Sequence, residues 1–469
     1  MLRLHNTLTR QFENFVPLSG EKVTLYTCGP TVYDNLHVGN WAAYVYWDTL
    51  VRILQIDGFT VDRVMNITDV GHLVSDADEG EDKLEKGARR ENKTAWEIAD
   101  HYTQKFLDGM RELNLVAPTH IAKATDYISQ QISLVRALKQ RGCTYQTSDG
   151  IYFDTSRFPH YADFAQLDLH AQKAGARVDA NSEKRQPWDF ALWKFTEPGK
   201  VRDMEWETPI DLLDTIPSDN KPIMGFPGWH LECSAIAMSL LGKTIDIHTG
   251  GIDHIPVHHT NEIAQSEAKT GKIFANYWMH NGFVNIDNVK MSKSLGNFIT
   301  VHDALKTIDG QVLRFFFATQ HYRKPINFTE KAVRDAETNL KYLKNTYEQP
   351  FTGTVDAQEL QAFKDKFVAA MDEDFNSANG ITVVFEMAKW INSGNYDAAV
   401  KQALAAMLEV FGIVFVEEVL DAEIEDLIQK RQEARANRDF ATADQIRDQL
   451  AAQGIKLLDT KDGVRWTRD

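Results

Sequence analysis

The feature that most constrains the fold is a strand, a polar loop, a helix and a second strand between residues 23 and 68. The β-rich run 23–29 is interrupted by glycine and proline, residues 41–55 carry apolar side chains at helical spacing, and 61–68 is β-rich again. This order predicts a βαβ unit with a parallel sheet. Ligands of such sheets bind at the carboxyl ends of the strands, so we expect a functional site there.

Polar residues gather at these two strand ends and predict a nucleotide site. They are Cys28, His37, Gly39 and Asn40 in the first loop, and Thr68 and Asp69 in the second. Gly39 would let a phosphate approach the backbone, and the following helix offers unpaired N–H groups and the positive end of its dipole to an anion. The alternative is that His37, which precedes the helix, only caps it or braces the loop.

A second group of residues offers ligands for a metal ion. His258 and Glu262 are four residues apart in a stretch of helical pattern, so their side chains share one face. With Cys233 and Cys28 they make a zinc-compatible set, which only the fold could bring together. The alternative is that the cysteines are small buried apolar residues and the histidines lie on the surface. Cys143 has no such companions and is interpreted as structural.

Composition limits the class of protein. A chain of 469 residues exceeds what one hydrophobic core usually organises, so we expect about two to four domains. Its net charge of −16 would repel nucleic acid, so such a partner needs a locally basic face. No window approaches the roughly 18 apolar residues of a membrane span. The N-terminal residues show no secretory signal and three cysteines make no disulfide framework, so we expect a cytoplasmic protein without membrane association.

Two short motifs resemble the signatures of class I aminoacyl-tRNA synthetases. They are HVGN at 37–40 and KMSKS at 290–294, a cationic loop. Further segments resemble the cysteinyl-tRNA synthetase family, in the same order and along nearly the whole chain: TLYTCGPTVYD, NITD, GWHLECS, DIHTGG, HHTNEIAQSEA and YWMHNGFV. The ordered set is far more specific than either motif alone.

The resemblance implies an α/β fold with helical additions. A Rossmann-like parallel-sheet catalytic domain would span 1–331, with an inserted connective region at roughly 115–225. A helical bundle that binds tRNA would follow at 332–420, where four runs have helical periods. A small α+β domain at 421–469 would recognise the anticodon.

The reaction implied by the resemblance is cysteine–tRNA ligation. ATP, with Mg²⁺, would activate L-cysteine to cysteinyl-adenylate and pyrophosphate, and cysteine would then pass to the 3′-terminal adenosine of tRNA(Cys). One Zn²⁺ per chain would be held by Cys28, Cys233, His258 and Glu262, with the substrate sulfur as a fifth ligand. A thiolate is a good soft ligand, whereas the hydroxyl of serine stays protonated and binds poorly. We expect the enzyme to be a monomer.

The same resemblance assigns residues to the reacting phosphates. His37 and Asn40 would donate hydrogen bonds to them, Gly39 would line the ATP site, and Lys290 and Lys293 would neutralise the leaving pyrophosphate. Serines and a glycine around the two lysines predict a loop that closes on ATP and opens for release.

Residues near the amino acid and the tRNA are assigned in the same way. Thr68 and Asp253 would hold the ammonium or carboxylate of cysteine, and Trp229 would form a wall of the pocket. The tRNA candidates are helically spaced arginines, which could present one basic face, and an aromatic residue that could stack on an unpaired base: Arg431, Arg435, Arg438 and Trp466.

Three features depart from the family pattern. Asn40 stands where the general signature has histidine, and its amide still donates a hydrogen bond but carries no charge. The charged stretch after Asp69 replaces an Asp- and Lys-rich continuation, and we expect a solvated loop leading into a helix. The segment of roughly 200–228 looks longer than usual and contains four prolines, so we expect a surface insertion.

Two other functions stay open from the sequence. A related ligase would activate cysteine but join it to an amino sugar, an interpretation that the C-terminal domains oppose. A non-catalytic tRNA-binding relative would show no cysteine-dependent ATP–pyrophosphate exchange, and the KMSKS lysines and the four zinc ligands oppose it. Charging of tRNA(Cys) would distinguish the synthetase from both.

Overall fold

The computed structural model describes residues 1–71, 73, 82–167, 182–217, 221–290, 298–416, 422–460 and 463–468. The chain forms two compact units, Met1–Val414 and Phe415–Asp469. Within the described residues, no helix is both long enough and apolar enough to cross a membrane.

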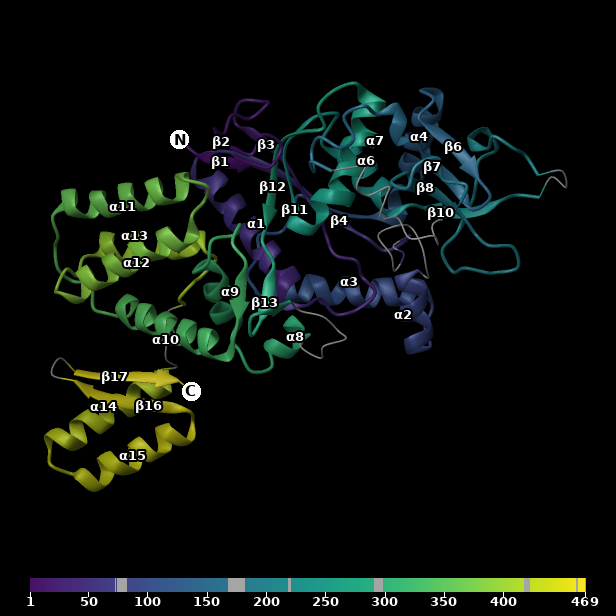
Figure 1. Ribbon diagram of the computed structural model, residues 1–469. Helices are drawn as coiled ribbons and strands as arrows, with labels where there is room; N and C mark the ends of the chain where they lie inside the picture. The colour runs from purple at the N-terminus through teal and green to yellow at the C-terminus, as the bar shows by residue number, and fades with distance from the viewer. Residues whose placement is uncertain are drawn as a thin grey trace. The chain divides into compact units, whose positions relative to one another are not determined.

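A five-stranded parallel sheet lies at the centre of the first unit (Figure 1). Its order is β12, β11, β3, β4, β5, and every neighbouring pair is parallel. The chain continues from β3 to β4 on one side, whereas β11 lies on the other, and ligands of α/β sheets bind at such a reversal. The strands are β3 (Lys22–Thr27), β4 (Thr60–Ile67), β5 (His120–Lys123), β11 (Ile245–Gly251) and β12 (Ala275–Asn281).

Helix α1 (Val38–Ile56) connects β3 to β4, which confirms the predicted βαβ unit. Side chains on most of its surface are buried, including Trp47 and Leu50, because the helix lies between the sheet and other helices of the unit. It begins three residues before the apolar period suggested, because His37 and Asn40 form a capping box at its N-terminus.

A second, antiparallel sheet lies beside the first, with the order β6, β7, β8, β10, β9 (Figure 1). The expected insertion began near residue 115, but β5 is still an edge strand of the parallel sheet, so the antiparallel part starts later. The expectation that 200–228 is a surface insertion was wrong, because β9 and β10 complete this sheet and Leu212 is buried in its core. The strands are β6 (Thr144–Thr147), β7 (Gly150–Phe153), β8 (Phe190–Phe195), β9 (Trp206–Glu207) and β10 (Met224–Pro227).

Helices and short strands surround these sheets. A π-helical turn at Ile255–His259 precedes α7, and His258 and His259, although adjacent in sequence, are both buried. The helices are α2 (Lys83–Glu91), α3 (Ala95–Glu112), α4 (Ile128–Gln140), α6 (Trp229–Leu240), α7 (Thr260–Thr270), α8 (Val301–Ala304) and α9 (Gly310–Ala318). The remaining strands are β1 (Arg3–Asn6), β2 (Gln11–Asn14), β13 (Val284–Ile286), β14 (Val289–Lys290) and β15 (Ile326–Phe328).

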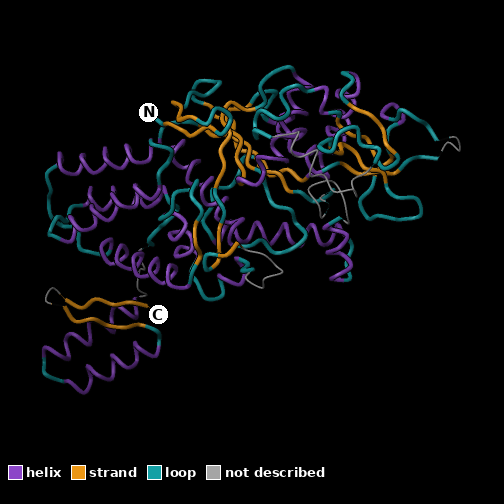
Figure 2. The backbone as a smooth tube through the Cα atoms, viewed as in Figure 1, coloured by secondary structure: helices purple, strands orange, loops and turns teal. Residues whose placement is uncertain are grey.

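The first unit ends in four helices, as the sequence predicted, and Figure 2 shows this part without strands. Their apolar faces pack together and bury Leu343, Val384 and Leu404. The helices are α10 (Glu330–Tyr347), α11 (Ala357–Asp372), α12 (Ser377–Asn392) and α13 (Ala398–Val410).

The second unit is a helical hairpin with a two-stranded antiparallel sheet, an α+β arrangement. Its core contains Ile424, Ile446, Leu450 and Ile455. The elements are α14 (Ala422–Ala436), α15 (Phe440–Ala452), β16 (Ile455–Thr460) and β17 (Gly463–Arg468).

Candidate active site

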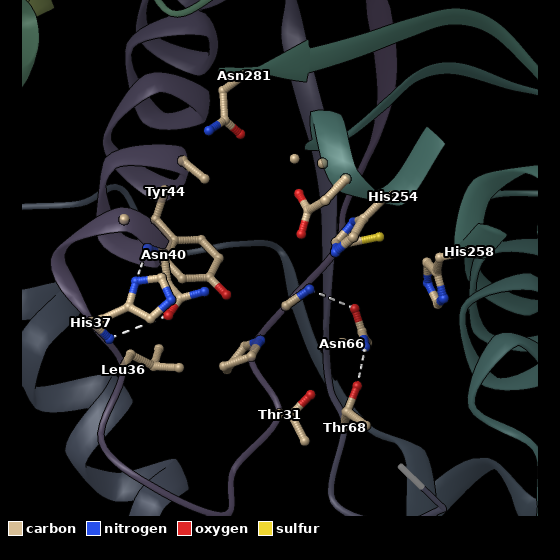
Figure 3. Close-up of a pocket in the computed structure, with 18 of the residues that line it drawn as sticks. Thr31, Leu36, His37, Asn40, Tyr44, Asn66, Thr68, His254, His258 and Asn281 are labelled. Carbon is tan, nitrogen blue, oxygen red and sulfur yellow. Dashed lines mark hydrogen bonds between the residues drawn. The ribbon is translucent and has the colours of Figure 1, made fainter. Parts of the chain in front are cut away.

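A cavity of about 570 Å³ opens at the carboxyl ends of the parallel strands, where the sequence predicted a site (Figure 3). Cys28 lines it after β3, Thr68 after β4, Gly250 at the end of β11, and Asn281 at the end of β12. The first turn of α1 closes one side, and the elements that carry the candidate metal ligands close the other.

Four potential metal ligands meet at this cavity, although they come from three separate parts of the chain. The ligand atoms of Cys28, Cys233, His258 and Glu262 lie within 4.8 Å of one another, and all four side chains are buried. In a tetrahedral zinc site, bonds of about 2.0–2.3 Å place ligand atoms roughly 3.3–3.8 Å apart. Small side-chain movements would therefore close this set around an ion. The alternative of surface histidines is wrong for His258, because the fold buries it against α6.

A second possible set shares two of these ligands and adds two histidines that the sequence reasoning missed: Cys28, His248, His259 and Glu262. His248 Nε2 lies 2.9 Å from Glu262 Oε2, and His259 Nε2 lies 3.4 Å from Cys28 Sγ. His259 precedes Glu262 by three residues, so helical spacing could have identified it. His248 reaches the cluster only through the pairing of β11 with β3, which no local pattern reveals.

A hydrogen-bonded chain holds His259 from behind. Its Nδ1 lies 2.7 Å from His280 Nε2, and His280 Nδ1 lies 2.8 Å from Thr7 Oγ1. Thr7 is distant from both histidines in sequence and lies beside them because its backbone N–H donates to the carbonyl of Trp278 on β12. Partners of this kind fix the orientation and tautomer of a ring beside a metal.

The cluster shifts the pKa values of its own members. Burial would raise the pKa of Cys28, but the hydrogen bond from Cys233 and the charges of His259 and His248 hold it well below its usual value. Burial would lower the pKa of His258, but the Glu262 carboxylate and Cys28 raise it to about 10. Any metal that binds here must displace protons, so its affinity rises with pH.

Glu232 is a buried carboxyl group on the cavity wall that the sequence reasoning also missed. Its side chain is 2% exposed, and burial raises its pKa to about 8. Oε1 accepts hydrogen bonds from Asn66 Nδ2 at 3.1 Å and from the Thr68 hydroxyl. Asn66 also lies 3.1 Å from Thr68 Oγ1 and accepts from the backbone N–H of Gly29, so it ties both loops together (Figure 3). The hydroxyl expected to touch substrate therefore already binds a carboxylate.

His37, Gly39 and Asn40 lie at the start of α1 on the other side of the cavity (Figure 3). His37 Nδ1 accepts the backbone N–H of Asn40 at 3.1 Å, and Asn40 Oδ1 accepts the backbone N–H of His37 at 3.2 Å. A Cβ atom on Gly39 would lie 2.9 Å from His37 Nδ1, so glycine makes room for the ring. The predicted helix cap is confirmed, and it fixes how both side chains face the cavity.

Trp229 and Asp253 both line the cavity, at different depths. Trp229 is half-buried at the start of α6, and its ring stacks on His258 with centroids 4.3 Å apart. Asp253 is exposed at the cavity rim, in a short helical turn after β11. Asp69 accepts two hydrogen bonds from Thr125 and supports the end of β4.

The lysines of the cationic loop are only partly covered by the described residues. Lys290 is the last residue of β14, which pairs with β13 beside the cavity wall. Lys293 lies outside the described residues, as do residues 72 and 74–81 of the charged stretch after Asp69. The later part of that stretch forms α2, the helix into which the sequence predicted the loop would lead.

The expectation of one basic face in the second unit was wrong. Arg431 is buried at 6% exposure, whereas Arg435 is exposed. Helix α14 ends at Ala436, and Arg438 follows in a left-handed conformation with φ of 62°, so it leaves the helical spacing. Trp466 lies in β17 opposite Leu457, and its side chain is outside the described part of the chain.

Solved structures with the same arrangement define the class. A Mycobacterium tuberculosis methionyl-tRNA synthetase in complex with methionyl-adenylate is similar with a TM-score of 0.57 at 14% identity, covering 83% of this chain and 89% of that chain. A leucyl-tRNA synthetase from Agrobacterium radiobacter K84 is similar with a TM-score of 0.62 at 10% identity, covering 85% and 84%. The fold is that of a class I aminoacyl-tRNA synthetase.

Sequence comparison narrows the class to one family. A family model described as tRNA synthetases class I (C) catalytic domain matches residues 14–338, a DALR domain matches 366–417, and a cysteinyl-tRNA ligase anticodon binding domain matches 417–466. Cysteine–tRNA ligases of Streptococcus pneumoniae serotype 4 and Streptococcus mutans serotype c are 61% and 56% identical, with complete coverage of both chains. The chain belongs to the cysteine–tRNA ligase family.

Membership over the full length also decides between the functions that the sequence left open. The family's reaction is the aminoacylation of tRNA with cysteine. The match includes the anticodon binding domain, so it favours the tRNA ligase over the amino-sugar ligase.

Proposed function

We propose that this chain activates L-cysteine with ATP, transfers it to tRNA(Cys), and selects its substrate through one zinc ion per chain. Cys28, Cys233, His258 and Glu262 would hold the ion, which when bound supplies a soft Lewis acid that accepts a thiolate in preference to a hydroxyl. The observation that carries the proposal is the meeting of these four ligand types within 4.8 Å at the cavity of a cysteine–tRNA ligase family member.

Exposure to the cavity favours this set over the set with His248 and His259. Cys28, Cys233 and His258 all line the cavity, so an ion between them would face the substrate. His248 and His259 do not line it, and both already contact members of the first set. Their role in this proposal is to orient Glu262 and Cys28 from behind.

Recognition of the sulfur atom answers a specificity problem. An apolar pocket separates substrates that differ by one small group only about 10- to 200-fold. Serine and cysteine differ by a single atom, so shape alone would let serine through. A ligand set that accepts sulfur directly supplies the additional discrimination.

The capping box at the start of α1 provides donors for the phosphates. Because His37 Nδ1 accepts a backbone N–H, the proton of the neutral ring resides on Nε2, which is then a donor. Asn40 uses its Oδ1 in the cap, so its amide N–H groups are the donors. With Gly39 and the helix N-terminus they would bind ATP, and Lys290 and Lys293 would neutralise the pyrophosphate.

The amino acid would lie between these two ends. Trp229 would cover it, since its ring already stacks on His258. Asp253 at the rim would face its polar end.

In the second unit, the exposed Arg435 and Arg438 would contact the anticodon region, while Trp466 stays a stacking candidate. We expect Arg435→Ala to raise the KM for tRNA roughly tenfold without changing ATP–pyrophosphate exchange. Arg447→Ala on α15 is the matched control, because Arg447 pairs with Asp444 on its own helix.

We further propose that the enzyme acts as a cytoplasmic monomer. Light scattering of the purified chain would test its oligomeric state.

One set of measurements tests the central proposal. We expect about one zinc per chain by metal analysis, cysteine-dependent ATP–pyrophosphate exchange with strong preference over serine, and charging of tRNA(Cys). Equal activation of serine and cysteine by the zinc-loaded enzyme would refute metal-based selection, and no exchange with cysteine would refute the activity.

A further inference from the structure

The buried carboxyl group of Glu232 has one engaged oxygen and one without a partner. Oε1 accepts from Asn66 Nδ2 and from the Thr68 hydroxyl. Oε2 is buried and has no hydrogen-bond partner among the described residues. A buried carboxyl oxygen without a partner costs free energy, so its retention needs an explanation.

Glu232 lines the cavity beside the sulfur-binding end. It precedes Cys233 on α6, and its Oε1 lies 3.9 Å from Cys233 Sγ. In free cysteine the thiol and the ammonium group are separated by only two carbon atoms. A substrate held by its sulfur at this end therefore carries its ammonium group into the neighbourhood of Glu232.

The chemistry of the wall fits an ammonium group. An ammonium group has three N–H donors, and a buried carboxylate forms strong, charge-assisted hydrogen bonds with such donors. Asp253 is the other carboxylate assigned to the amino acid, but it is exposed at the rim, where water weakens an ion pair. The deeper carboxyl group is the more selective partner.

We propose that Glu232 binds the α-ammonium group of the substrate cysteine. Thr68 and Asn66 hold the carboxylate of Glu232 in position for this contact. The inference rests on the proposed function, because it takes cysteine as the substrate. It changes the role of Thr68 from a direct substrate contact to a positioning residue, since its hydroxyl donates to Glu232.

Binding of three ligands, cysteine, cysteamine and 3-mercaptopropionate, distinguishes the ammonium contact from the other contacts of the site. Cysteamine keeps the thiol and ammonium of cysteine but lacks the carboxylate, and 3-mercaptopropionate keeps the thiol and carboxylate but lacks the ammonium. Their dissociation constants would be measured by calorimetry on the zinc-loaded full-length wild type and on Glu232→Gln. Zinc content would be determined for each preparation.

We expect Glu232→Gln to raise the dissociation constants of cysteine and cysteamine by the same factor, roughly 10- to 100-fold, because one charge-assisted hydrogen bond is lost. Binding of 3-mercaptopropionate should be unchanged. Glu267→Gln on α7 is the matched control, since Glu267 accepts the backbone N–H of Phe274 and does not line the cavity. Equal weakening of all three ligands, or unchanged cysteine binding, would overturn the inference.

A second variant keeps the test decisive if Glu232→Gln loses metal or folds poorly. Thr68→Val removes the hydroxyl that holds Oε1 and leaves both the carboxylate and Cys233 in place. It should raise the dissociation constants of cysteine and cysteamine by a smaller common factor and leave that of 3-mercaptopropionate unchanged. Any other pattern contradicts the assignment. Absence of cysteine-dependent exchange in the wild type would instead refute the proposed function itself.

Discussion

The two ends of the cavity are built in opposite ways. At the α1 end, His37, Gly39 and Asn40 lie within four consecutive residues, and reciprocal hydrogen bonds between neighbours set their geometry. At the metal end, Cys28 and Glu262 are 234 positions apart and meet only because β3, β11 and the helices around them pack together. The geometry of the α1 end is therefore set by neighbouring residues, whereas that of the metal end depends on the whole sheet.

The two ends also differ in burial and charge. His37 and Asn40 are half-buried and would donate hydrogen bonds to the phosphates, while Cys233 and Glu262 are buried almost completely and would bind a cation. Electrostatic interactions are stronger where water is excluded. Changes at the metal end should therefore have larger effects than changes at the α1 end, and the two ends should respond independently.

The largest effect is expected from Cys233→Ser. Serine is a poor zinc ligand, so zinc content should fall from about one per chain toward zero, and cysteine-dependent exchange should fall roughly 100- to 1,000-fold. Cys143→Ser is the matched control, because Cys143 is also buried but lies in a different core cluster. Retained zinc in Cys233→Ser would show that this residue is not a ligand.

The second-largest effect is expected from Asn40→Asp, which changes the α1 end alone. Aspartate can still accept the backbone N–H of His37, so the cap and the free energy of unfolding should change little. The donor amide is replaced by a negative charge, so exchange should fall about 100-fold at unchanged zinc content. Asn376→Asp, at the N-cap of α12, is the control and should retain full exchange. Loss of zinc in Asn40→Asp would disprove the independence of the two ends.

A smaller effect is expected from His259→Gln, which changes a residue behind the metal end. If His259 orients Cys28, zinc affinity measured by competition with a chelator should fall about 10- to 100-fold, while saturating zinc restores exchange. His120→Gln, far from the cavity on β5, serves as the control. Complete loss of zinc at saturating metal would favour the second ligand set instead.

The smallest effect is expected from Gly39→Ala. The added Cβ would lie 2.9 Å from His37 Nδ1, so the ring must shift by a few tenths of an ångström. Because a displacement of about 1 Å can cost 100-fold in rate, this shift should lower exchange by roughly 3- to 10-fold. An effect as large as that of Asn40→Asp would mean that Gly39 itself contacts the nucleotide.

Sequence reasoning succeeded where neighbours along the chain determine the structure. The strand, loop, helix and strand of the first 70 residues, the helices after residue 330 and the ends of the strands that carry Cys28 and Thr68 were all predictable, because hydrophobic period and breakers act within a few residues. Arg431, Arg435 and Arg438 show the limit of this reasoning. Their helical spacing predicted one face, but the helix ends before Arg438, and Arg431 is buried.

By itself, then, the order of residues determined the parallel α/β core, the cap at α1 and the ligand types available to a metal. Only the tertiary structure decided which of these ligands reach the cavity, which histidines lie behind them, and that Glu232 points one oxygen at Thr68 and leaves the other unpaired. The physical reason is that burial and charge pairing depend on contacts between segments hundreds of residues apart, and such contacts exist only after the sheet has assembled.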